Sequence, residues 1–292
     1  MKNTIIVTGG AGFVGSNLIK RLVEKTSFKI ISVDNYSTGH KKNHINSKRV
    51  NYIKSDTNKI SKLLKNELKN IHTLFHFGEF SRIYQSFLKM NECIKSNSIG
   101  SNSVFNFCLL NNIKLVYSAT SASIGNKGKD KNLSPYAFTK AKNLELLENL
   151  KKWFNFKFEV IYFYNVYGPK QIAKGKMATV IGIFEQAFKD KKPLPVVLPG
   201  SQSRRFTHIE DTVRICYLAW KKDLSRHYSI SNRESFSIIE VAKMFKSKIK
   251  FLKKRPGERY ASALADMNLS NKVYKHFGKK KLKDYINEII KN

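Results

Sequence analysis

Cysteine is scarce in this chain. Only three cysteines occur among 292 residues, and Cys93, Cys108 and Cys216 lie far apart. An odd and widely spaced set is a poor basis for a disulfide framework or a zinc site, and it fits a reducing compartment. We therefore expect no metal site and a cytoplasmic location.

Long apolar runs are missing as well. No run approaches the ~20 residues that a transmembrane helix needs, so we expect no membrane partner. The first β-branched run begins within a few residues of Met1, which leaves no room for a secretory signal peptide. The length suits one large domain or two closely joined ones.

Acidic residues are also few. The 21 Asp and Glu residues face 54 Lys and Arg residues, which gives a formal net charge of +33. Such a positive charge can bind a nucleic acid or an anionic surface. The lysines are spread along the whole chain, however, and no nucleic-acid motif accompanies them. A compositional drift toward Lys and Asn explains the charge better, so we expect no nucleic-acid partner. The charge should still attract a polyanionic small molecule.

The clearest pattern lies at the N-terminus. A β-branched run over residues 5–7 is typical of a buried parallel strand, the glycine-rich segment TGGAGFVG follows at 8–15, and apolar residues then recur at helical spacing. Strand, glycine turn and helix predict the phosphate-binding corner of a dinucleotide fold. We expect Gly9 to allow the turn, Gly12 to admit the pyrophosphate and Gly15 to let the helix pack on its strand.

A second strand is expected at 29–33, and it ends in Asp34. This acid lies about 20 residues beyond the glycine turn, where a carboxylate can accept the ribose hydroxyls of NAD and repel the 2′-phosphate of NADP. The alternative is a simple turn aspartate, because polar residues follow it. Lys41 and Lys42 keep NADP open as the less favoured cofactor.

Strands and helices continue to alternate along the chain. We expect strands at 52–53, 73–77 and 114–118, and helices at 58–69 and 95–111. The second helix should face the core through Ile99, Val104, Phe105, Cys108 and Leu109. This alternation predicts a parallel, doubly wound α/β sheet.

A tyrosine and a lysine stand four residues apart on the next helix. Pro135 suits its first turn, and Tyr136 and Lys140 share one helix face. A nearby ammonium group favours the phenolate form of tyrosine, which can then accept a proton. The alternative is an ordinary surface pair, which we would prefer if the glycine turn were absent.

Together, the glycine turn, Asp34, Thr120 and the Tyr136–Lys140 pair resemble the extended short-chain dehydrogenase/reductase family. Within it, the chain is similar to the NAD-dependent nucleotide-sugar epimerases and dehydratases over nearly its whole length. Five further segments match motifs of that group, at residues 76–78, 97–100, 165–169, 204–211 and 255–258.

The resemblance implies a Rossmann-like doubly wound sheet with a smaller C-terminal α/β lobe that binds the substrate. Residues 1–165 and 207–232 would form the NAD-binding domain, and residues 166–206 and 233–292 the lobe. Helices at 176–189, 237–246 and 282–290 and an extended segment at 193–198 would belong to the lobe. The family usually associates through helices matching 95–111 and 135–153, so the resemblance implies a homodimer or homotetramer.

The resemblance also assigns roles to single residues. The expected catalytic residues are Thr120, which would hydrogen-bond the reacting sugar hydroxyl, Tyr136 as the base, and Lys140 as its partner. The residues expected to bind NAD are Gly9, Gly12, Phe13, Val14, Gly15, Asp34, Asn35, Asp56, Ser118, Tyr136 and Lys140. The residues expected to bind the sugar nucleotide are Ser81, Arg82, Asn165, Arg204, Arg255 and Glu258. Asp211 has a rival interpretation as the N-cap of a helix at 212–222, and His208 reads as a packed or ligand-side histidine.

The expected reaction is NAD-dependent oxidation at C4 of a UDP- or GDP-linked sugar, followed by epimerisation, for surface polysaccharide synthesis. A C4 dehydrogenase that releases the keto sugar, for example from a GDP-heptose, is the alternative. A 4,6-dehydratase is disfavoured because Ser121 and Ala122 stand where dehydratases carry Asp-Glu. Glu79 stands where the family has Ala, and could contact the sugar or be a solvated loop acid. A non-enzymatic NAD sensor is disfavoured because the Tyr136–Lys140 pair is kept.

Overall fold

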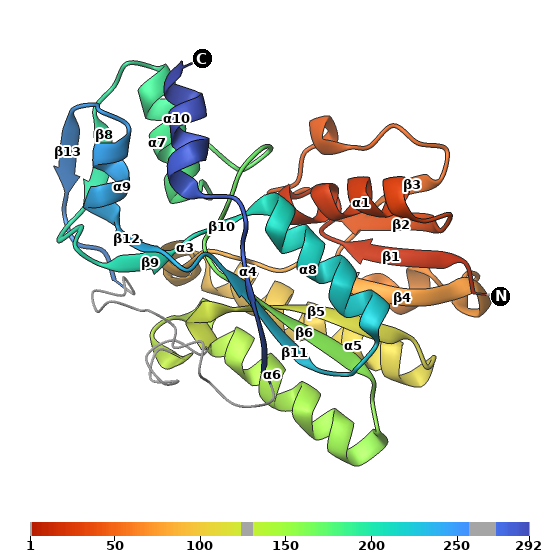
Figure 1. Cartoon of the computed structure of the whole chain (residues 1–292). Coiled ribbons are helices and arrows are strands. Elements are labelled where there is room, and N and C mark those ends of the chain that lie inside the picture. The colour runs from red at the N-terminus through yellow and green to blue at the C-terminus, as the bar shows by residue number, and fades with distance from the viewer. Residues whose placement is uncertain (1, 124–130, 257–272, 292) are drawn as a thin grey trace.

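The centre of the computed structural model, which describes residues 2–123, 131–256 and 273–291, is an eight-stranded parallel sheet. Its strand order is β14-β11-β6-β5-β4-β1-β2-β3 (Figure 1). The strands are β1 Thr4–Thr8, β2 Lys29–Asp34, β3 Val50–Lys54, β4 Ile71–His76, β5 Lys114–Thr120, β6 Phe158–Phe163, β11 His227–Ser231 and β14 Val273–Phe277. The order reverses between β1 and β4, and ligands of such sheets bind at the carboxyl ends of the strands near this point.

Helices cover both faces of the sheet. Helices α1 (Phe13–Lys25) and α8 (Ile209–Lys222) pack on one face, and α5 (Ser101–Leu110) and α6 (Pro135–Phe154) on the other. Alternate residues of β1 pack into the cores on the two faces of the sheet, because successive side chains of a strand point to opposite faces. Ile5 and Val7 join the core under α1 and α8, and Ile6 joins the core under α5 and α6. The doubly wound parallel sheet is therefore confirmed.

A smaller lobe stands beside the sheet and has its own apolar core (Figure 1). That core includes Phe184, Phe206, Phe245 and Ile286. The lobe's elements are α7 Val180–Lys189, β8 Leu194–Val197, β9 Ser203–Arg205, β12 Ser235–Ser237, α9 Ile238–Met244, β13 Ile249–Leu252 and α10 Leu282–Lys291. Strands β7 Val166–Tyr167 and β10 Thr207–His208 pair with each other and connect the lobe to the sheet. Helices α3 Ile83–Leu88 and α4 Met90–Ile94 contact α6.

Strand β14 departs from the expected division of the chain. It lies within the range 233–292 that was assigned to the lobe, yet it pairs in parallel with β11 at the end of the large sheet. The chain therefore returns once more from the lobe to the sheet before it forms α10. The division into two domains stays a prediction.

Three expected helices differ in the structure. The helix at 58–69 is only a short turn, α2 (Ile60–Leu63), between 3₁₀ turns at Thr57–Lys59 and Leu68–Asn70. Ile60 and Leu64 are buried, and Leu63 and Leu68 are partly buried against the same core. The helix expected from 176 begins at Val180, where the Thr179 hydroxyl caps it by accepting from the Gly182 N–H at 3.0 Å.

The helix at 95–111 begins as a π-helix over Lys95–Gly100 before α5 continues it. A π-turn holds more residues than an α-turn and so shifts which residues face the core. Ile99, expected inside, is 53% exposed, whereas Val104, Phe105 and Cys108 are buried as expected.

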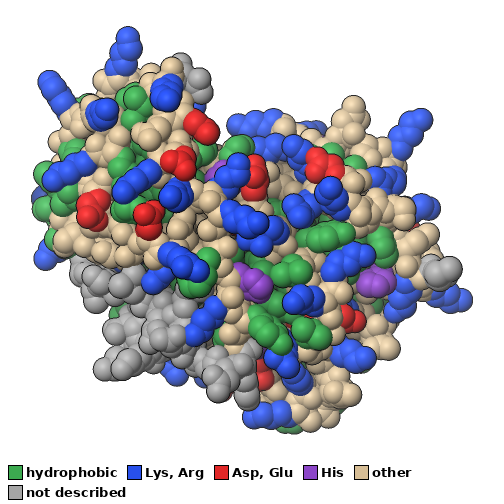
Figure 2. Space-filling view, in the orientation of Figure 1, with side chains coloured by type: hydrophobic (Ala, Val, Ile, Leu, Met, Phe, Trp, Pro, Cys, Tyr) green, Lys and Arg blue, Asp and Glu red, His purple; other side chains and the backbone are tan. Residues whose placement is uncertain are grey.

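The surface reflects the basic composition. Figure 2 shows Lys and Arg side chains scattered over the visible face, with fewer acidic ones among them. In the ranges that the structure describes, no helix combines the length and apolar character that crossing a membrane requires.

Candidate active site

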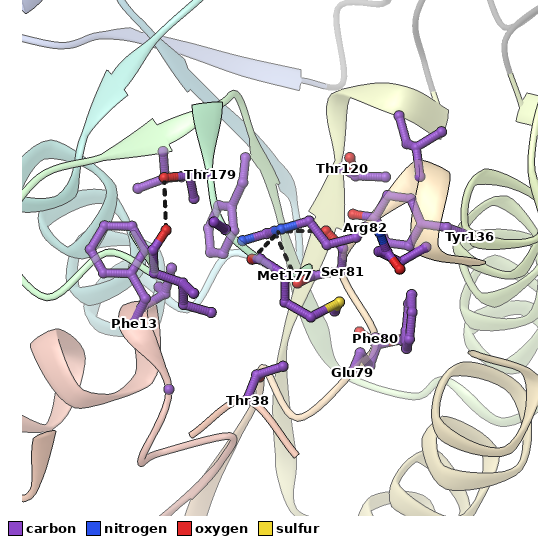
Figure 3. Close-up of a pocket in the computed structure, with 18 of the residues that line it drawn as sticks. Phe13, Thr38, Glu79, Phe80, Ser81, Arg82, Thr120, Tyr136, Met177 and Thr179 are labelled. Carbon is purple, nitrogen blue, oxygen red and sulfur yellow. Dashed lines mark hydrogen bonds between the residues drawn. The ribbon is translucent and has the colours of Figure 1, made fainter. Parts of the chain in front are cut away.

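A pocket opens at the carboxyl ends of the parallel strands and extends to the lobe. Figure 3 shows how residues from distant segments, among them Phe13, Glu79, Arg82, Tyr136 and Met177, converge on it. The expected site residues that line it are Gly9, Gly12, Phe13, Val14, Gly15, Asp34, Asn35, Asp56, Ser81, Arg82, Ser118, Thr120, Tyr136, Lys140, Asn165, Arg204 and Arg255. Glu258 lies outside the described residues.

The glycine turn forms one end of the pocket. Gly9 has φ +71°, and a Cβ atom there would lie 2.7 Å from the backbone of Phe77. A Cβ on Gly15 would lie 2.2 Å from the carbonyl oxygen of Gly9, so this helix can approach its strand only with glycine. Helix α1 begins at Phe13 without a capping side chain or an acidic residue in its first turn. Its N-terminus therefore suits a phosphate group.

Asp34 lies at the end of β2, on the same side of the pocket. Its carboxylate accepts hydrogen bonds from the backbone N–H groups of Ala11 at 2.9 Å and Tyr36 at 2.8 Å. Burial raises the pKa of Asp34, and the backbone N–H groups oppose that shift. Beside it, the Asn35 amide donates to the Asp56 carboxylate at 2.8 Å. A carboxylate has about four acceptor positions, so Asp34 can still accept from a ribose hydroxyl. The glycine turn, the uncapped helix and Asp34 together fit NAD.

Tyr136 and Thr120 lie beside each other on one side of the pocket (Figure 3). Ser134 caps helix α6 by accepting from the Ala137 N–H at 3.1 Å, and Pro135 occupies its first turn, which places Tyr136 near the helix start. The Thr120 hydroxyl at the end of β5 lies beside the phenol, and it accepts a hydrogen bond from the Ala122 N–H at 3.2 Å. Burial raises the pKa of Tyr136 to about 12, and the nearby Thr120 hydroxyl opposes this shift.

Lys140 is held by two acceptors. Its ammonium group donates to the Glu79 carboxylate and to the Ser118 carbonyl oxygen. The Glu79 side chain is 2% exposed, so its interpretation as a solvated loop acid is wrong. The single indication of this ion pair in the sequence is that an acid stands where the family has alanine.

The arginines lie toward the lobe. Arg82 donates from Nε to the Met177 carbonyl oxygen at 2.8 Å and from Nη1 to the Ser81 carbonyl oxygen at 2.8 Å, so it joins the loop after β4 to the segment before α7 (Figure 3). Arg204 on β9 is 9% exposed, and the Arg255 guanidinium lies 5.2 Å from the centre of the Tyr84 ring.

Several lining residues were not expected from the sequence. They include Thr38, Phe80, Met177 and Thr179. These side chains carry no charge and match no motif, so only the folded arrangement of the loops reveals them. Asn165, which was expected, has φ +37° and donates to the Arg205 carbonyl oxygen at 2.8 Å.

Asp211 does not cap its helix. Helix α8 begins at Ile209, and the His208 ring accepts from the Glu210 N–H at 3.3 Å. Asp211 is buried in the first turn, where its carboxylate accepts from the N–H groups of Lys279 and Lys280 at 2.8 and 3.0 Å. It therefore fixes the segment between β14 and α10, and the N-cap interpretation is wrong.

Comparison with known proteins gives a consistent result. The sequence profile of the NAD dependent epimerase/dehydratase family matches residues 5–231. A Methanocaldococcus jannaschii protein provisionally named a UDP-glucose 4-epimerase is 27% identical over 272 residues, which is 88% of each chain. The structure of a UDP-N-acetylglucosamine 4-epimerase from Methanobrevibacter ruminantium, in complex with UDP-N-acetylmuramic acid, has a TM-score of 0.86 and 25% identity over 100% of this chain and 98% of its own.

The fold is also similar to that of a Thermus thermophilus UDP-glucose 4-epimerase in complex with NAD. The TM-score is 0.79 and the identity is 21%, over 91% of each chain.

Proposed function

The chain belongs to the NAD dependent epimerase/dehydratase family, and we propose that it is a 4-epimerase of a nucleotide-linked sugar. The enzyme depends on NAD. The observation that carries the proposal is that Tyr136 and Thr120 lie side by side in a pocket that begins at the glycine turn and ends at the arginines of the lobe.

The residues of the glycine turn, Asp34 and Ser118 would hold NAD, with Asn35 and Asp56 beside its adenosine half. Bound NAD supplies a reversible acceptor for the two electrons and the hydrogen of the sugar C4–H bond. Tyr136 takes the proton of the C4 hydroxyl, and Thr120 orients that hydroxyl through its own hydrogen bond. Tyr136 returns the proton when the keto sugar is reduced on its other face. A positioned proton acceptor of this kind contributes about 10²–10⁴-fold in rate.

We propose that Arg204 and Arg255 bind the diphosphate of the substrate, together with Asn165, Ser81 and Arg82. A guanidinium group presents a planar fork of donors that matches phosphate oxygens. The relatives compared above are named for UDP-linked sugars, which supports a UDP-sugar over a GDP-sugar. We further propose that the product serves surface polysaccharide synthesis.

Dehydration is disfavoured by the residues that follow Thr120. Ser121 and Ala122 are both buried, and neither can remove a proton from C5 of the sugar. A C4 dehydrogenase remains the alternative, because it shares the first step and differs only in the fate of the keto sugar.

The experiment that separates these reactions is incubation of the purified protein with NAD and a panel of UDP- and GDP-sugars, followed by NMR and absorbance at 340 nm. A 4-epimer without net NADH supports the proposal. A 4-keto product with one equivalent of NADH supports the dehydrogenase. Tyr136→Phe should lower kcat about 10²–10⁴-fold and leave NAD binding intact, and full turnover by this variant would refute the mechanism.

We also propose that the protein is a homodimer or homotetramer that associates through α5 and α6, which contact each other. These helices and the π-turn before α5 carry large exposed apolar side chains, Ile99, Leu110, Phe138 and Trp153. The two-domain division is likewise a proposal, which the separate apolar core of the lobe supports.

A further inference from the structure

Glu79 is a buried carboxylate that the proposed reaction does not use. It follows β4 and lies at the meeting point of α5, β5 and α6. Besides Lys140, its carboxylate accepts hydrogen bonds from the Ser101 hydroxyl at 2.8 Å, the Tyr117 hydroxyl at 3.1 Å and the Asn143 amide at 3.2 Å. Four donors from three different elements therefore fix this one side chain, and their hydrogen bonds offset the cost of burying its charge.

The network also fixes Lys140. An ammonium group has three N–H donors, and two of them go to Glu79 and to the Ser118 carbonyl oxygen. The Lys140 nitrogen lies 4.7 Å from the centre of the Tyr117 ring, so that ring limits its movement as well. One N–H donor remains for a bound ligand, and its direction is set by the other two.

Glu79 changes the charge around Tyr136 as well as the geometry. A lysine beside a tyrosine normally favours the phenolate, but here a carboxylate in direct contact balances the lysine. We propose that Glu79 is a positioning residue that fixes Lys140 and offsets its charge, so that Tyr136 stays protonated until oxidised NAD brings a new positive charge into the pocket. This inference rests on the proposed role of Tyr136 as the proton acceptor.

The other titratable groups near Tyr136 are consistent with this view. Burial and Glu79 raise the pKa of Tyr136, the Arg82 guanidinium lowers it, and Cys93 adds a small upward contribution. His76 is connected to Glu79 by Ser101, whose hydroxyl hydrogen-bonds both side chains. Burial lowers the pKa of His76 to about 4, so the ring is neutral at neutral pH. In the described structure, the titratable side chains that face Tyr136 or Glu79 are those of His76, Arg82, Cys93, Tyr117 and Lys140.

The test is the titration of Tyr136 in the protein without NAD or sugar. The protein is labelled with ¹³Cζ-tyrosine, and the signal of Tyr136 is identified by its loss in Tyr136→Phe. In Glu79→Gln, which keeps the size of the side chain and removes its charge, the midpoint should move down by about one pH unit or more, because Lys140 is then unbalanced. Glu79→Asp keeps the charge and should stay near the wild-type midpoint.

Glu145→Gln is the matched control. Glu145 lies on α6, the helix that carries Tyr136 and Lys140, and its side chain pairs with Lys142 and is 61% exposed. Its Tyr136 midpoint should equal that of the wild type. A Glu79→Gln midpoint equal to or above the wild-type value would overturn the inference. Circular dichroism confirms that each variant is folded before the midpoints are compared.

The pH dependence of turnover gives a second readout. If the 4-epimerase proposal holds, the acidic limb of kcat/KM should move to lower pH in Glu79→Gln. A merely structural role would lower the rate at every pH and leave the limb in place, which would count against the inference. The NMR titration needs no turnover, so it decides the role of Glu79 even if the proposed reaction is wrong.

Discussion

Asp34 gives the sharpest test of how the pocket holds NAD. The perturbation is Asp34→Asn, which keeps the shape of the side chain but replaces one acceptor oxygen with an NH₂ donor. In the wild type, the two carboxylate oxygens accept from two different backbone N–H groups, those of Ala11 and Tyr36. Asparagine can satisfy only one of them, so the other N–H group faces the amide NH₂.

The magnitude follows from these contacts. Leaving one backbone donor without an acceptor costs about 1–3 kcal/mol of folding free energy. Loss of a hydrogen bond from a ribose hydroxyl to a charged acceptor removes about 1.5–3 kcal/mol of binding free energy, which is roughly a 10–100-fold higher Kd for NAD. The preference for NAD over NADP should also decrease, because the variant no longer repels the 2′-phosphate.

The assay is isothermal titration calorimetry with NAD and with NADP, accompanied by thermal unfolding of the free protein. Asp190→Asn is the control, since Asp190 is an exposed acid at the end of α7, and its variant should leave both quantities unchanged. Unchanged NAD affinity in Asp34→Asn would refute the assignment of Asp34 to the ribose. An unchanged melting temperature would refute its role in fixing the glycine turn.

Three further predictions follow from other contacts. Gly15→Ala places a Cβ atom 2.2 Å from the Gly9 carbonyl oxygen, so it should lower stability by about 1–3 kcal/mol and abolish measurable NAD binding by calorimetry; normal binding would contradict the packing argument. His76 has a folded-state pKa of about 4 against 6.5 for the free side chain, so its contribution to stability is complete above pH 6.5 and is lost as the pH falls to 4. Between these pH values, urea unfolding should show a decrease in the free energy of unfolding that is about 3 kcal/mol larger in the wild type than in His76→Gln. Parallel curves of stability against pH would contradict this. Leu110→Lys should lower the molar mass measured by light scattering if α5 forms the subunit interface, whereas Leu224→Lys, which is also exposed but lies outside that interface, should not.

Much of the fold could be predicted from local patterns. The β-branched runs, the glycine turn and the proline at the start of α6 act within a few residues, so they fix elements without knowledge of the rest of the chain. The π-turn at 95–100 was not predicted in this way. Its Asn97 contacts segments far away in the sequence: the amide donates to the Phe80 carbonyl oxygen at 3.0 Å and to the Thr139 hydroxyl at 3.2 Å.

The site shows the same division. The residues expected around NAD and the sugar came from motifs, and all of them except Glu258, which lies outside the described residues, line one pocket. The partner of Lys140 could not be found, because Glu79 is 61 positions away in the sequence and its neighbours become visible only when β4, α5 and α6 are in place. Long-range polar networks in the interior depend on the whole fold, and no local pattern encodes them.

Strand β14 has a consequence for how separate molecules behave in solution. Among the strands that the structure describes, it is the outermost on its side of the sheet, and an outermost strand can recruit a strand of another molecule and start aggregation. Its exposed rings, Tyr274 and Phe277, are covered by the guanidinium groups of Arg226 and Arg233, at 4.7 and 4.6 Å from the ring centres. Two copies that approach along this edge therefore meet through like charges. The basic side chains along β14 thus oppose self-association at this edge of the described sheet.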